Sequence, residues 1–129
     1  VPGEAWTTPW VVGVWSREGM DGLSDRLHRW VRATWPVPGE RPVTLNTWEA
    51  VYFDHDLERL SRLAEAAAEV GVERFVLDDG WFQGRVDDRR ALGDWFVDAQ
   101  RWPEGLHPLA QRVTGLGMQL GLWVEPEMV

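Results

Sequence analysis

The sequence contains no cysteine among its 129 residues. It therefore cannot form a disulfide or a thiolate zinc site, and this absence fits a reducing compartment. Basic residues are also few: 13 against 21 acidic residues, which gives a net charge of −8. An acidic chain repels phosphate backbones and anionic lipid headgroups, which argues against nucleic-acid and membrane partners.

Long apolar runs are missing as well. No stretch approaches the roughly 18 apolar residues that a membrane-spanning helix needs. No charged segment followed by an apolar one opens the chain, as it would in a signal peptide, and we expect a cytoplasmic protein. The chain begins at Val1 and stops at Val129, directly after an apolar run with an acidic tail. We therefore expect it to be a piece of a longer protein.

Signatures of several enzyme classes are also absent. No Gly-x-Gly-x-x-Gly follows an expected strand, so a nucleotide-binding sheet lacks support. The chain has no Gly-x-Ser-x-Gly motif and no cysteine nucleophile. Its histidines, His28, His55 and His107, are far apart and form no His-Glu-x-x-His motif. We expect no metal site and no cofactor.

Tryptophan, in contrast, is abundant, with ten residues in a chain that is 44% hydrophobic. That content is enough for one domain with a core. Packing accounts for several of the indoles, such as Trp30 and Trp35 in an expected helix. Indole faces also bind the C–H surfaces of sugars, and carboxylates accept hydrogen bonds from sugar hydroxyls. An acidic, tryptophan-rich chain is therefore typical of a carbohydrate site.

The sequence pattern of the first third of the chain predicts few secondary-structure elements. Residues 1–16 are expected to be extended, and residues 22–35 to form a helix that Ser24 or Asp21 caps. The proline-rich residues 36–42 are expected to be a linker.

From residue 43 the pattern predicts strands that alternate with helices. The strands are expected at 43–53, 72–77 and 118–124. Asp54 or Asp56 caps the first helix and Gly71 stops it, whereas Pro103 lies in the first turn of the second. The order β-α-β-loop-α-β implies parallel strands with right-handed crossovers.

Two apolar runs end in acids and indoles: Phe75-Val76-Leu77-Asp78-Asp79-Gly80-Trp81 and Leu120-Gly121-Leu122-Trp123-Val124-Glu125-Pro126-Glu127. Barrel enzymes carry their sites at the carboxyl ends of the strands. We therefore favour part of a (β/α)8 barrel, its first three or so units, over a doubly wound sheet. The loop segment 93–98 is expected to be a hydrophobic plug over the barrel mouth.

Asp78 and Asp79 are adjacent, so both can face one ligand only if the strand ends there, and Gly80 supplies the turn. Their repulsion has to be offset by hydroxyl donors, a cation or water. A retaining glycosidase holds its two catalytic carboxyl groups about 5–5.5 Å apart, on either side of the scissile bond. We interpret the adjacent pair as hydroxyl binders instead. From the residues alone, a solvated acidic turn is an equal alternative, and Trp48 and Trp123 fit core positions better than a sugar platform.

Four segments together resemble the α-galactosidases, or melibiases, of glycoside hydrolase family 36. They are residues 45–53, 76–82, 92–98 and 116–129, which contain Asn46-Thr47-Trp48-Glu49, Asp78-Asp79-Gly80-Trp81, Gly93-Asp94-Trp95-Phe96 and Gly121-Leu122-Trp123-Val124-Glu125-Pro126 in the order and at the spacing of the family. The resemblance implies an α/β fold in which residues 1–20 end an N-terminal β-sandwich. Residues 21–42 would be a linking helix with its linker, and residues 43–129 the first part of a truncated (β/α)8 catalytic barrel.

The resemblance also implies retaining hydrolysis of terminal α-galactosyl residues in oligosaccharides such as melibiose and raffinose. It assigns galactose hydroxyls to Asp78 and Asp79, and it places Trp48 and Trp123 in the same pocket. The family's nucleophile lies in a Lys-Trp-Asp motif on the next strand, with the acid/base farther downstream. This chain contains no Lys-Trp-Asp, so we expect no catalytic residue in it and no activity from it alone. A galactosyltransferase of the raffinose or stachyose synthase type and a non-catalytic remnant module are open alternatives, as is a homo-oligomeric state of the longer protein.

Overall fold

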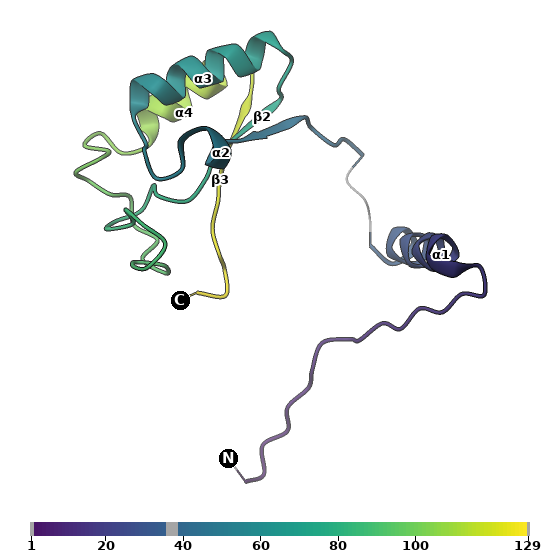
Figure 1. The fold of residues 1–129 in the computed structure, drawn as a ribbon. Coiled ribbons are helices and arrows are strands. Elements are labelled where there is room, and N and C mark those ends of the chain that lie inside the picture. The colour runs from purple at the N-terminus through teal and green to yellow at the C-terminus, as the bar shows by residue number, and fades with distance from the viewer. Residues whose placement is uncertain (1, 36–38, 129) are drawn as a thin grey trace. The chain divides into compact units, whose positions relative to one another are not determined.

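The computed structural model describes residues 2–35 and 39–128 of the chain (Figure 1). It divides into two compact units, Val1–Glu40 and Arg41–Val129. The middle of the expected linker, residues 36–38, lies outside the described residues. Among the described residues, no helix combines the length and the apolar character needed to cross a bilayer.

The first unit consists of one helix and an irregular segment. Helix α1 covers Gly19–Thr34, so the expected helix is present but begins three residues before residue 22. Its N-cap position is Glu18, and the prediction that Ser24 or Asp21 caps it is wrong because Asp21 already lies in the first turn. Residues 4–16, all of them described, are neither helix nor strand. Their assignment to a β-sandwich stays a prediction.

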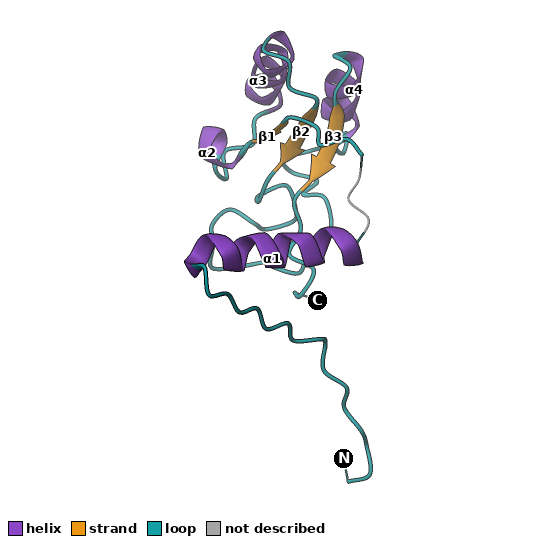
Figure 2. Cartoon of the chain, turned by 90° about the vertical axis from the view of Figure 1, so that its right-hand side faces the viewer, coloured by secondary structure: helices purple, strands orange, loops and turns teal. Residues whose placement is uncertain are grey.

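The second unit is built on a three-stranded parallel sheet (Figure 2). Its strands β1, β2 and β3, at Thr44–Asn46, Arg74–Leu77 and Gln119–Leu122, lie in the order β1-β2-β3. Both pairings are parallel, which confirms the expected arrangement. Helices α3, Leu57–Glu69, and α4, His107–Gly115, contact each other. The core unites side chains from these elements, among them Leu60, Ala64, Phe75, Leu77, Leu109 and Val113.

Helix α3 follows the sequence prediction closely. The backbone N–H of Arg59 donates to Asp56 Oδ1 (2.7 Å), which identifies Asp56 as the cap. The helix ends at Glu69, its C-cap is Val70, and Gly71 follows as the expected stop. Val70 lies past the last helical residue and is 81% exposed.

The expected strand at 43–53 is wrong beyond Asn46. Residues Trp48–Val51 form a short helix, α2, so Trp48 begins a helix and does not lie in the middle of a strand. The cause is local: Asn46 Oδ1 accepts a hydrogen bond from the backbone N–H of Trp48 (2.8 Å). A side chain that bonds to the backbone two residues ahead turns the chain out of the extended conformation.

The second expected helix also begins later than the sequence indicates. Helix α4 starts at His107 with Pro108 in its first turn, and Pro103 lies outside it. The N–H of Gly105 donates to the carbonyl of Trp102 (2.9 Å), and Gly105 has a φ of +68°. This left-handed conformation keeps the segment around Pro103 out of a continuous helix.

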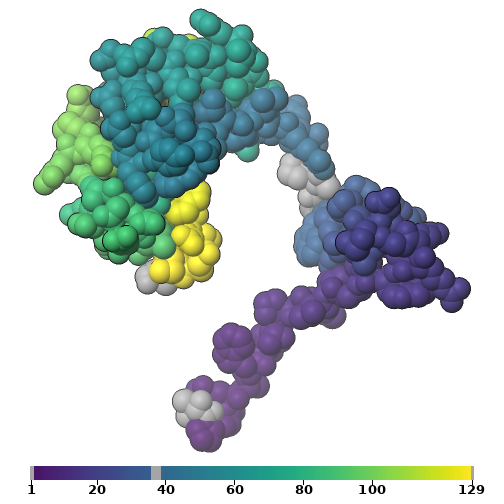
Figure 3. All heavy atoms as spheres, in the orientation of Figure 1, coloured from purple at the N-terminus to yellow at the C-terminus, as the bar shows by residue number. Residues whose placement is uncertain are grey.

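The long connection between β2 and α4 folds back on itself. Phe82 and Val97 form an antiparallel bridge, and Trp95 packs against the ring of Phe82 with centroids 4.7 Å apart. Trp95 Nε1 also donates to the carbonyl of Met128 (2.9 Å), so this loop lies against the segment after β3 (Figure 3). Trp95 thus packs against its neighbours, whereas Phe96 is 73% exposed. That residues 93–98 plug a barrel mouth stays a prediction.

Candidate functional site

A cleft of about 550 Å³ opens at the carboxyl ends of the three strands. It is lined by Asn46, Trp48, Glu49, Asp78, Asp79 and Trp123. The structure therefore brings together all four residues that the sequence singled out. It adds Asn46 and Glu49, which the sequence reasoning missed. Glu125 and Glu127, although described, are not among these lining residues.

The Asp78 carboxylate is buried and held by neutral donors. Asn46 Nδ2 donates to its Oδ2, and the backbone N–H of Asp79 donates to its Oδ1 (2.7 Å). The backbone N–H of Asp78 itself donates to Thr47 Oγ1 (3.0 Å), which ties the end of β2 to the end of β1. Because Asn46 Oδ1 accepts from Trp48 N–H, the orientation of the Asn46 amide is fixed as well.

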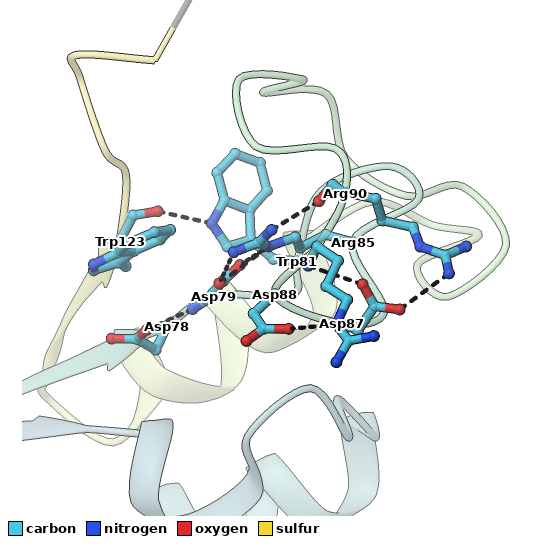
Figure 4. Close-up of polar contacts among 9 residues, drawn as sticks. Asp78, Asp79, Trp81, Arg85, Asp87, Asp88, Arg90 and Trp123 are labelled. Carbon is cyan, nitrogen blue, oxygen red and sulfur yellow. Dashed lines mark hydrogen bonds and ion pairs between the residues drawn. The ribbon is translucent and has the colours of Figure 1, made fainter.

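Asp79 is held by a cation, Arg85 (Figure 4). Arg85 Nε donates to Asp79 Oδ1 (2.8 Å), and Arg85 Nη2 donates to Asp79 Oδ2 (2.7 Å). Only 6% of Asp79 and 5% of Arg85 are exposed. The hydrogen bond to Asp79 raises the pKa of Arg85 above its ordinary value, so the guanidinium stays charged. This is the cation that offsets the repulsion between the adjacent carboxylates.

Sequence reasoning missed Arg85. The adjacent pair Arg89 and Arg90 stands out in the sequence, yet these residues form ion pairs with Asp88 (4.0 Å) and Asp87 (3.1 Å) near the surface of the loop (Figure 4). The sequence spacing does not distinguish Arg85 from Arg89 and Arg90, because the fold of the loop determines which acid each arginine contacts.

The turn after the two aspartates requires glycine, as expected. Gly80 has a φ of +108°, and a Cβ there would lie 3.3 Å from Cδ1 and 3.4 Å from Cα of Phe53. A side chain at this position would be strained and crowded. The turn therefore places both carboxylates at the same strand end.

Neighbouring aromatic residues hold the two tryptophans of the cleft. The Trp48 ring has edge contacts with Tyr52 and Phe53, at centroid distances of 5.2 and 5.1 Å. Trp81 Nε1 donates to the carbonyl of Trp123 (2.9 Å), and the Trp95 ring lies 6.2 Å from the Trp123 ring. Both indoles are half-buried, so each keeps part of its surface accessible beside the carboxylates.

His55 lies behind the Gly80 turn and is buried. Burial, followed by the charge of Arg101, lowers its pKa from 6.5 to about 4, so the imidazole is neutral near pH 7. Within the described part of the chain, no group of three histidine, cysteine, aspartate or glutamate residues could hold a metal ion.

Comparison with known proteins assigns this chain to a family. The Melibiase family model matches residues 5–129. An α-galactosidase of Escherichia coli is 50% identical over 125 residues, which cover 95% of this chain and 18% of that protein.

Two solved structures of variants of the GH36 α-galactosidase AgaA from Geobacillus stearothermophilus are similar. The complex with 1-deoxygalactonojirimycin has a TM-score of 0.76 and 47% identity, covering 87% of this chain and 16% of that one. The stachyose complex has a TM-score of 0.73 and 48% identity, and the match covers 84% of this chain and 16% of that one. These findings confirm the resemblance that the four sequence segments carry. The chain belongs to the melibiase family.

Proposed function

We propose that this chain is the N-terminal part of the (β/α)8 catalytic barrel of a longer retaining α-galactosidase, called the full-length enzyme below. Two findings support this: family membership and a cleft at the carboxyl ends of three parallel strands, where barrel enzymes carry their sites. The chain spans about 18% of the α-galactosidase of E. coli, so the remaining strands would lie outside it.

We propose further that the cleft binds the terminal galactose of the substrate. The observation that carries this proposal is the gathering of Asp78, Asp79, Trp48 and Trp123 around one space. Its volume of about 550 Å³ falls within the roughly 300–1,000 Å³ of small-molecule sites. Ionised carboxylates accept hydrogen bonds from hydroxyls, and indole rings pack against the apolar C–H face of a pyranose. Together they supply both kinds of contact that a hexose needs.

The same geometry argues against bond cleavage by these two carboxylates. They follow one another at one strand end, whereas a retaining enzyme places its acid/base and nucleophile on either side of the scissile bond. Arg85 engages both oxygens of Asp79, which stabilises the anion and weakens it as a nucleophile. The bond-breaking groups would therefore come from the rest of the full-length enzyme.

Hydrolysis of an aryl α-galactoside by the full-length enzyme tests this proposal. We expect turnover with α-galactose as the first product, observed by proton NMR before the anomers equilibrate. Absence of turnover, or β-galactose as the first product, would contradict a retaining α-galactosidase. Product analysis with raffinose and an excess of a sugar acceptor separates hydrolysis from the galactosyltransferase alternative. A calorimetric titration with galactose that gives no heat would favour the remnant-module alternative.

A further inference from the structure

We propose that Arg85 is a positioning residue for galactose recognition: it fixes the Asp79 carboxylate in the orientation that accepts a sugar hydroxyl. This inference rests on the proposed function, since it requires that Asp79 contact the sugar. Arg85 lies within the part of the chain that the structure describes, but it does not line the cleft. It therefore acts on the sugar through Asp79.

The contact between Arg85 and Asp79 fixes direction as well as position. Nε and Nη2 of the guanidinium reach different oxygens of the carboxylate, at 2.8 and 2.7 Å. Two such parallel hydrogen bonds determine the plane of the carboxylate, which a lysine ammonium cannot do. The two guanidinium nitrogens occupy one edge of the carboxylate. A carboxylate offers about four acceptor positions, so the remaining ones are available to a hydroxyl in the cleft.

Arg85 is itself held from three other directions. Its guanidinium carbon lies 5.7 Å from the centroid of the Phe53 ring and 5.8 Å from that of Phe82. Its Nη1 donates to the carbonyl of Arg90 (2.7 Å). These contacts come from the segment after α2, from the β2 end of the loop and from the middle of that loop. Arg85 is therefore oriented before any ligand enters the cleft.

The charges at the strand end explain why a cation is needed at Asp79 in particular. The side-chain contacts of Asp78 come from the amide of Asn46 and the backbone N–H of Asp79, both neutral donors. With Arg85, the two carboxylates and the guanidinium carry a net charge of −1, and without it the charge would be −2. Two buried adjacent carboxylates without a cation would repel each other, and the Asp79 carboxylate would turn away from Asp78. This change removes the acceptor that the hydroxyl needs.

The test uses the full-length enzyme with Arg85→Met and Arg85→Lys, and with Asp79→Asn to identify the hydroxyl that Asp79 binds. Affinities for galactose and for each monodeoxygalactose are measured by titration calorimetry. The matched control is Arg90→Met, which removes a neighbouring arginine whose side chain pairs with Asp87 away from the cleft. Each variant is accepted only if its melting temperature stays close to that of the unchanged enzyme.

We expect the unchanged enzyme to bind one deoxygalactose distinctly less tightly than galactose, and Asp79→Asn to abolish that difference. Arg85→Met should abolish the difference at the same hydroxyl and weaken galactose binding about 10- to 150-fold, the value of a charge-assisted hydrogen bond. Arg85→Lys should restore only part of it, and Arg90→Met should leave all affinities unchanged.

Three outcomes would overturn the proposal. The decisive one is a folded Arg85→Met enzyme that still discriminates at the Asp79 hydroxyl as the unchanged enzyme does. The second is an equal loss of affinity for every deoxygalactose, which indicates a purely structural role. The third, if Arg85→Met does not fold, is full discrimination by Arg85→Lys. If the unchanged enzyme binds no galactose, the proposed function fails with it, which distinguishes the two failures.

Discussion

Replacement of Asp78 by asparagine gives a sharp test, because every hydrogen bond around this side chain has a fixed direction. Trp48 N–H donates to Asn46 Oδ1, Asn46 Nδ2 donates to Asp78 Oδ2, and Asp79 N–H donates to Asp78 Oδ1. In Asp78→Asn, one oxygen becomes an NH₂ group that faces another N–H. Rotating the Asn46 amide does not help, because its own NH₂ would then face Trp48 N–H.

The single variant therefore loses one hydrogen bond to a charged acceptor and leaves a buried donor unpaired. Each such loss costs about 1.5–3 kcal/mol in stability. If Asp78 accepts a galactose hydroxyl, the lost charge weakens sugar binding by a similar free energy, roughly 10- to 150-fold in affinity. Asn46→Asp should also destabilise the protein, because it places two carboxylates face to face.

The exchange of the two residues, Asn46→Asp with Asp78→Asn, restores the whole pattern. The carboxylate placed at the end of β1 would accept from Trp48 N–H and from the new amide at the end of β2. The oxygen of that amide would accept from Asp79 N–H. Thermal unfolding of the full-length enzyme should place the exchange variant above both single variants. Galactose affinity should stay low, because the charge has moved to the end of β1. Additive destabilisation in the exchange variant would refute this hydrogen-bond network.

The remaining predictions concern pH and the support of Trp123. Above about pH 6.5 His55 is neutral in both the folded and the unfolded chain, so it does not lower the free energy of unfolding. As pH falls from 6.5 towards about 4, His55 takes up a proton in the unfolded chain but stays neutral in the folded one. Stability should therefore fall by up to about 3 kcal/mol over this window. His55→Phe should flatten the pH dependence of the melting temperature. The same dependence in the variant and the unchanged protein would contradict a buried neutral imidazole. Trp81→Phe removes the hydrogen bond to the Trp123 carbonyl and should lower stability by about 1 kcal/mol. It should also weaken galactose binding in calorimetry, and unchanged binding would show that this bond does not position the indole.

The sequence allowed the gathering of the candidate residues to be predicted better than the elements around them. Asp78, Asp79 and Trp123 directly follow apolar runs, and parallel strands bring their carboxyl ends to one edge, so their meeting follows from topology. Asp56 was one of two expected caps because its position before an apolar periodicity has a local cause. The cap has a local cause, and the shared strand edge follows from the parallel pairing that the order of the elements predicts.

The errors arise where one side chain overrides the periodic pattern or where a distant partner decides. Asn46 bonds to the backbone of Trp48 and ends the strand, although the residues that follow have the pattern of an extended segment. Arg85 pairs with Asp79 because the fold of the loop places its guanidinium beside the rings of Phe53 and Phe82. Periodicity does not report such contacts.

The most direct test of the proposed galactose site is a crystal structure of the full-length enzyme with galactose bound. We predict the sugar in the cleft at the strand ends, with hydroxyl oxygens within hydrogen-bonding distance of Asp78 and Asp79. The pyranose should also lie beside Trp48 and Trp123. Galactose bound at another place, with these four side chains free of contact to it, would contradict the assignment of this cleft.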